Sequence, residues 1–257
     1  IGHTERPDVV VGKLLEGRLA VFCDGTPFVL TLPYILIEYF HFNENYYNNF
    51  YFATFSRILS FVGFFITTSI PAIYTALITF HQEMLPTPLI LSISAARQGI
   101  PLPTIAEMIG ILFIFETLRE ASVRIPAVVG QTISIVGALI IGQAAVEAKL
   151  ISAPIIIIAA AAGITGFLVP KMEQAVIILR LIFLLASAFM GLYGYIFILI
   201  LTYIHLTSMK SFGIPYLLFA SSLVAEDQKD AVIRAPWWFM NKRPKMLVDK
   251  NTKRQNS

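Results

Sequence analysis

The chain has 257 residues, of which 56% are hydrophobic and only 14% charged, and its mean hydropathy is +0.73. Soluble domains carry about a quarter charged residues, so this composition excludes an ordinary soluble globular protein and indicates an integral membrane protein. The net charge is +3, and a single cysteine, Cys23, excludes an internal disulfide framework and a multi-cysteine metal site.

Residues 1–54 are mixed in polarity, and we expect them to form a membrane-proximal lead-in. The stretch "RPDVVVGKLLEG" is typical of a short helix. The stretch "RLAVFCDGTPFVLTL" predicts two strands around Asp24 and Gly25, a dipeptide that favours a two-residue hairpin turn. The lead-in therefore adds a short N-terminal β-hairpin to the fold.

Long apolar runs follow, and they predict an all-α polytopic membrane protein with a transmembrane domain over residues 55–208. A spanning helix needs about 20 mostly apolar residues. Runs of that order cover residues 55–80, 128–148, 150–169 and 181–205, and a fifth run, residues 104–125, is interrupted by charge. We expect four to five transmembrane helices. The proline-rich stretch "HQEMLPTPLILSISAARQGIPLP" predicts a re-entrant or interfacial helix.

The charged run carries a ladder at helical spacing. Its members are Glu116, Arg119, Glu120 and Arg124. Residues three and four apart are neighbours on one helix face, so the carboxylates and guanidiniums are expected to pair along that face. Because charged groups facing lipid are costly, such a helix is expected at the interface or beside a wet cavity.

Residues 209–257 form a basic tail, which from Glu226 onward holds eight basic and four acidic residues. The excess of lysine and arginine places this end in the cytoplasm, and we interpret it as a solvated tail rather than a nucleic-acid-binding segment. If residues 1–54 are cytoplasmic as well, the number of crossings is even.

The stretch "VGQTISIVGALIIGQAAVEA", residues 129–148, is long enough to span a bilayer but unusually rich in small residues. On a helix these gather on one face, which favours close helix packing. This packing face comprises Gly130, Ser134, Gly137, Ala138, Gly142 and Ala145. In a symmetric oligomer it is expected to bring neighbouring helices together.

The opposite face of the same stretch is a candidate pore lining. It comprises Val129, Ile133, Val136, Ile140, Gln143 and Glu147. Two interpretations remain open. The branched residues either contact lipid while Gln143 and Glu147 reach the headgroups, or they form a gate that closes by dewetting, with a ring of Glu147 attracting cations at its mouth.

Catalytic and metal-binding patterns are absent from the sequence. The four histidines show no metal-ligand spacing, and "HQEML" lacks the second histidine of a zinc protease helix. There is no phosphate-binding glycine loop and no nucleophile elbow. We therefore expect no enzyme, no metal and no cofactor.

Several long stretches together resemble the A subunit of the GerA family of bacterial spore germinant receptors. They are "ERPDVVVGKLLEGRLAVFCDGTPFVLTLP", "FHQEMLPTPLILSISAARQGIPLP", "FETLREASVRIPAVVGQTISIVGALIIGQAAVEAKLISAP", "SMKSFGIPYL" and "KDAVIRAPWWFMNKRPKML". In the family a soluble domain precedes the "ERPDVV" block, so we expect the chain to be a fragment that lacks most of that domain.

The resemblance implies a subunit of a nutrient-responsive receptor in the spore inner membrane. It implies two partners, a transporter-like B subunit and a C-subunit lipoprotein, and self-association into a gated monovalent-cation channel that triggers germination. Two alternatives remain open. A secondary transporter requires two related halves, which the sequence lacks, and a non-conducting scaffold would tolerate loss of Glu147.

Overall fold

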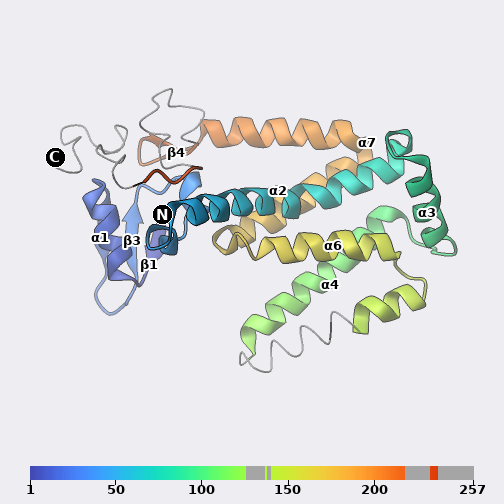
Figure 1. The fold of residues 1–257 in the computed structure, drawn as a ribbon, viewed down its shortest axis with the longest axis horizontal. Coiled ribbons are helices and arrows are strands. Elements are labelled where there is room, and N and C mark those ends of the chain that lie inside the picture. The colour runs from blue at the N-terminus through green and yellow to red at the C-terminus, as the bar shows by residue number, and fades with distance from the viewer. Residues whose placement is uncertain (126–136, 138–139, 218–231, 237–257) are drawn as a thin grey trace. The chain divides into compact units, whose positions relative to one another are not determined.

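The computed structural model describes residues 1–125, 137, 140–217 and 232–236, and these residues are mostly helical (Figure 1). They belong to two compact units, one made of residues 1–62 with 201–257 and the other of residues 63–200. The boundaries fall inside two long helices, α2 (Phe50–Phe80) and α7 (Glu173–Ser208). The prediction of a mostly helical protein with a short N-terminal β-hairpin is confirmed.

The first unit begins with an antiparallel sheet in the order β1-β3-β2, formed by β1 (Gly2–Thr4), β2 (Leu19–Phe22) and β3 (Val29–Leu32). Residues 23–28 connect the two strands of the predicted hairpin, a longer connection than the two-residue turn that the sequence favoured. Gly25 takes a φ of +82° within it, a conformation that glycine adopts without steric cost. Strand β1 was not predicted, because three residues are too few to show alternation.

Helix α1 (Pro7–Leu15) stands between β1 and β2 in the chain. Pro7 at the first helical position and Asp8 in the first turn both favour a helix start. Gly17, with a φ of +89°, follows its end. Two 3-10 helices, η1 (Leu36–Tyr39) and η2 (Asn43–Tyr46), then lead into α2.

The residues after α7 return to the first unit. Strands β4 (Lys210–Ser211) and β5 (Ile214–Pro215) form a second hairpin. The amide of Leu36 donates a hydrogen bond of 3.1 Å to the carbonyl oxygen of Tyr216. The beginning of the basic segment, residues 209–217, is therefore folded against residues that precede α2.

Arg234 attaches a further part of the basic segment to the same unit. Its side chain is buried, and its guanidinium donates hydrogen bonds of 2.6 and 3.1 Å to the carbonyl oxygens of Asn48 and Tyr46. Its backbone amide donates to the hydroxyl of Thr54 at 3.2 Å. Residues that precede α2 and residues that follow α7 thus fold together in the first unit.

The second unit contains the remaining helices together with most of α2 and α7. They are η3 (Gln82–Met84), α3 (Thr87–Arg97), α4 (Thr104–Arg124), α6 (Ala153–Gly166) and η4 (Pro170–Met172), and residues 140–147 are helical too. Within the described part of the chain, two helical stretches are long and apolar enough to cross a membrane, α2 and residues 170–208. Helix α6 is apolar but has 14 residues, about 21 Å.

Helix α7 differs from the single span expected for residues 181–205. Gly191 lies inside it with φ of 62° and ψ of −144°, and the ribbon reverses its direction at this point (Figure 1). A Cβ atom added to Gly194 would clash with the carbonyl oxygen of Ala186, and the rings of Phe183 and Tyr195 pack edge to face with centroids 5.4 Å apart. The apolar run is therefore a helical hairpin.

The core of the second unit brings α2, α4, α6 and α7 together. One cluster of buried side chains joins Met108 and Ile111 of α4 to Ile155 of α6 and Leu184 of α7. Helices α2 and α6 meet closely, since the hydroxyl of Thr67 donates to the carbonyl oxygen of Ala162 at 2.5 Å. This packing positions the residues discussed below.

Candidate functional site

The described residues of the candidate pore face are all exposed. Ile140 is 59% exposed, and Gln143 and Glu147, one and two turns further along the helix, are exposed as well. The other three residues of this face, Val129, Ile133 and Val136, lie outside the described residues. An exposed row of one apolar, one amide and one carboxylate side chain is thus available to another molecule.

The small-residue face of the same helix is turned into the chain's own core. Gly142 is buried, and Ala145 belongs to the cluster with Met108 and Ile155. A Cβ atom added to Gly137 would lie 3.2 Å from the side chain of Leu118 in α4. Three further small residues, Gly130, Ser134 and Ala138, lie outside the described residues. The described small residues therefore pack against α4 and α6 of the same chain.

The charge ladder of α4 divides into two parts. Arg119 pairs with Glu116, and their side chains are half-buried. Arg124 pairs with Glu120 at 2.6 Å, and both of these side chains are exposed. The first pair faces the interior of the second unit, whereas the second lies on its surface.

The inner part of the ladder extends to α7, and no local pattern in the sequence indicated this extension. Arg180, which is 7% exposed, donates to the carboxylate of Glu116 at 3.0 Å, and Arg119 also pairs with Glu173 at 2.9 Å. Two carboxylates and two guanidiniums form an electrically neutral cluster. Buried charges persist only when they are paired and hydrogen-bonded, so this cluster fixes the start of α7 against α4.

We predict that Arg119→Ala lowers the free energy of unfolding by about 1.5–3 kcal/mol, the usual range for hydrogen bonds to charged groups. Arg124→Ala is the matched control and should cost less than about 1 kcal/mol, because its ion pair is exposed. Thermal unfolding of the purified variants measures both. Equal effects of the two substitutions would place the whole ladder on a solvated surface.

A second buried carboxylate was missed by the sequence reasoning. Glu107, near the start of α4, has no solvent-exposed surface. It accepts hydrogen bonds from the guanidinium of Arg97 at 3.2 Å and from the backbone amide of Ser152 at 2.8 Å. The available signal was an isolated carboxylate in the apolar stretch "TIAEMIGIL", since an ionisable residue in such a run is a functional candidate by default.

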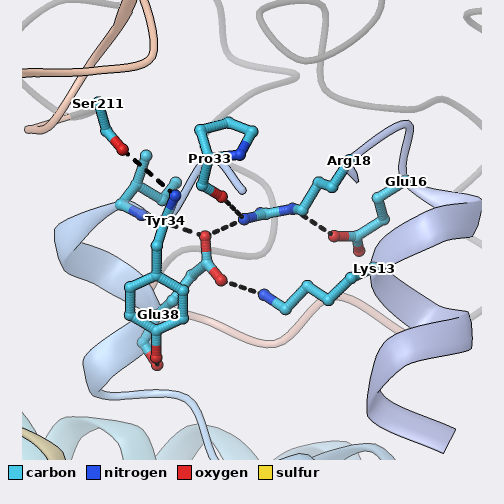
Figure 2. A network of polar contacts seen from close by, with 8 residues as sticks. Lys13, Glu16, Arg18, Pro33, Tyr34, Glu38 and Ser211 are labelled. Atoms are coloured by element: carbon cyan, nitrogen blue, oxygen red, sulfur yellow. Dashed lines mark hydrogen bonds and ion pairs between the residues drawn. The ribbon is translucent and has the colours of Figure 1, made fainter. Parts of the chain in front are cut away.

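The first unit holds a third buried carboxylate, Glu38 of η1, which is 4% exposed (Figure 2). Lys13 and Arg18 both pair with it, and Figure 2 shows each cation meeting a different oxygen of the carboxylate. Burial alone raises the pKa of Glu38, but the charges of Lys13 and Arg18 outweigh burial and hold that pKa below its ordinary value. The network joins α1, the start of β2 and η1.

The remaining chemistry of the described residues is limited. No three histidine, cysteine, aspartate or glutamate side chains in the described ranges gather into a group suited to a metal ion. The single cysteine, Cys23, is exposed. The buried charged groups described above join helices to one another.

These features define a helical protein with apolar helices of membrane-spanning length, a helical hairpin and internally neutralised charges. Over residues 1–246 the sequence matches the family described as the Bacillus/Clostridium GerA spore germination protein. The chain belongs to this family, as its resemblance to GerA A subunits predicted.

Individual relatives agree with this assignment. Spore germination protein KA of Bacillus subtilis (strain 168) is 47% identical over 255 residues, which cover 98% of this chain and 47% of that protein. Spore germination protein A1 of the same organism is 38% identical, covering 100% of this chain and 53% of that protein. Spore germination protein GerLA of Bacillus cereus is 37% identical, with coverages of 97% and 51%. The chain thus spans about half the length of these relatives. No solved structure matches it.

Proposed function

We propose that this chain is the membrane portion of a germinant receptor subunit that oligomerises into a nutrient-gated channel for monovalent cations. Its relatives are named spore germination proteins, which supports a role in germination. The observation that carries the channel proposal is the orientation of residues 140–147, which bury their small face in the core and expose Ile140, Gln143 and Glu147. The proposed partners are copies of the same chain, a transporter-like B subunit, a lipoprotein C subunit and the spore inner membrane.

The fold of the first unit supports an even number of membrane crossings. The chain leaves this unit along α2 and returns to it along α7. Residues that precede α2 are hydrogen-bonded to residues that follow α7. Two segments that fold together must lie on the same side of a membrane. The basic residues after Glu226 favour the cytoplasmic side for both.

Two contacts of α2 support the close packing of α2, α6 and α7 in the second unit. Gly63, near the middle of α2, lies against Leu168, which follows α6. At the end of α2, Phe80 and His81 lie against Gly191. Four to five passes remain the proposed number, and among the described residues α2 and residues 170–208 are long and apolar enough for them.

The proposed pore lies along the exposed face of residues 140–147. A ring of isoleucine side chains resists wetting and holds a pathway closed, and a ring of carboxylates at its mouth raises the local concentration of cations. The exposed positions of Ile140 and Glu147 in the single chain suit these two roles, because in a ring of copies they would face the axis.

We expect Ile140→Ser to release potassium without germinant at least about tenfold faster than the unsubstituted protein, which corresponds to a barrier lower by about 1.4 kcal/mol. Ile157→Ser in α6 is the matched control, because Ile157 is 67% exposed but lies on no proposed pore face. Glu147→Gln should remain closed at rest and conduct less, most visibly at low ionic strength where charges are weakly screened.

The measurement is potassium release from spores, or from liposomes that contain the assembled receptor, with and without germinant. If Ile140→Ser and Ile157→Ser both stay closed and Glu147→Gln conducts normally, residues 140–147 do not line a cation pathway. A non-conducting scaffold would then be the better description of the chain.

A further inference from the structure

Glu107 ties three segments of the second unit together through one carboxylate. Its Oε1 atom accepts a hydrogen bond from Arg97, the last residue of α3, and its Oε2 atom accepts one from the amide of Ser152, the residue before α6. Glu107 itself lies in the first turn of α4. Two nearby residues belong to the apolar cluster of this region. They are Met108, which follows Glu107 in α4, and Ile155 of α6.

The segment bonded to Glu107 is joined directly to the proposed pore face. The amides of Leu150 and Ile151 both donate to the carbonyl oxygen of Ala145, at 2.9 and 3.2 Å. These bonds close the connection between residues 140–147 and Ser152. Because these two bonds tie the connection to Ala145, we expect a displacement of Ser152 to move the end of the helix that carries Gln143 and Glu147.

The cation that neutralises Glu107 comes from a lightly held helix. In α3, Ile93 is the buried residue, and the apolar side chains of Leu89 and Leu91 are exposed. The bond from Arg97 to Glu107 joins α3 to α4, and α3 also contacts α6. A helix held this way is readily displaced by a partner that contacts its exposed side chains.

Alternative partners for the carboxylate lie nearby. In the described part of the chain, the hydroxyl of Tyr74 and the Oγ of Ser152 are buried without a hydrogen-bond partner. Tyr74 packs against the cluster that contains Met108, the residue next to Glu107 in α4. Because buried polar groups seek hydrogen bonds, the hydroxyl of Tyr74 is an alternative donor for Glu107 once Arg97 leaves.

We propose that Glu107 is the positioning residue of the gate. Paired with Arg97 and with the amide of Ser152, it holds residues 140–147 in the resting orientation. Displacement of α3 turns the carboxylate towards the hydroxyl of Tyr74 and away from Ser152, which releases residues 140–147. This inference rests on the proposed channel function. It predicts that one substitution speeds potassium release and another slows it. A purely structural role of the same residues does not predict such opposite effects.

The test measures potassium release from spores or liposomes carrying the full receptor. Arg97→Gln should raise release without germinant about tenfold or more, because the resting partner is lost. The separate substitution Arg97→Lys should leave the receptor closed at rest, since lysine keeps the positive charge. Tyr74→Phe should slow germinant-triggered release several-fold while leaving the receptor closed at rest, because the released arrangement loses a donor. The control is Arg124→Gln, whose exposed pair with Glu120 is expected to affect neither rate.

Tyr74→Phe introduces no unpaired charge, so it keeps the inference testable if Arg97→Gln fails to fold. Unchanged triggered release in Tyr74→Phe, or a closed resting state in folded Arg97→Gln, overturns the positioning role. If Ile140→Ser leaks while these variants behave as the unsubstituted receptor, the channel function stands and only the role of Glu107 falls. If Ile140→Ser is closed as well, the proposed function falls with it.

Discussion

Gly191→Ala is expected to lower the free energy of unfolding by about 2–6 kcal/mol, the sum of backbone strain of about 1–3 kcal/mol and overpacking of about 1–3 kcal/mol. The φ and ψ of Gly191, 62° and −144°, belong to a region that residues with a Cβ rarely adopt. The added Cβ would lie 2.7 Å from the ring of His81 and 3.0 Å from the Cβ of Phe80. Neither the turn nor its packing against the end of α2 tolerates the methyl group.

Gly163→Ala in α6 is the matched control for this substitution. A Cβ atom at Gly163 meets nothing within 4 Å, and alanine is the better helix former, so stability should be kept or slightly raised. Thermal unfolding in detergent, together with the yield of folded protein, measures both variants. Equal melting of Gly191→Ala and Gly163→Ala would mean that α7 is a continuous helix at this position.

Glu38→Ala is expected to cost about 3–5 kcal/mol, because removing one partner of a buried ion pair leaves uncompensated charge behind. Here the residues left behind are two cations, Lys13 and Arg18, with side chains 20% and 5% exposed. Glu44→Ala is the control. Glu44 also pairs with an arginine, Arg6, at 2.9 Å, but both side chains are largely exposed, and such pairs contribute little.

The same network predicts how stability depends on pH. Because the pKa of Glu38 is lower in the folded protein than its ordinary value, its contribution is fully present above about pH 4.3, the pKa of an unfolded glutamate. The contribution is lost as pH falls through the folded pKa. Unfolding measured between neutral and acid pH should therefore show a loss of stability that Glu38→Ala lacks. Parallel profiles for the two proteins would contradict this role.

Local signals in the sequence predicted the elements that depend on neighbouring residues. The hairpin around Asp24 and Gly25 formed because turn residues stood between two apolar strands. The ion pairs within α4 formed because their members are three and four residues apart. For these features the chain within a few residues contains all the information that is needed.

Features that depend on distant residues were not predictable in this way. Gly191 stands in an apolar run without proline or charge, and glycine is common in membrane helices, so nothing local indicated a reversal. The partners of Glu107 lie 10 and 45 residues away, and Glu116 binds Arg180 in another helix. The burial of the small residues against α4 and α6 also depended on packing that spacing alone does not determine.

A single-particle image of the purified receptor, viewed along the membrane normal, tests the central claim most directly. The proposed channel predicts a closed ring of copies of this chain in which Glu147 and Ile140 face the axis while Gly142 and Ala145 remain packed inside each copy. A receptor with one isolated copy, or a ring whose axis is lined by other residues, would contradict it.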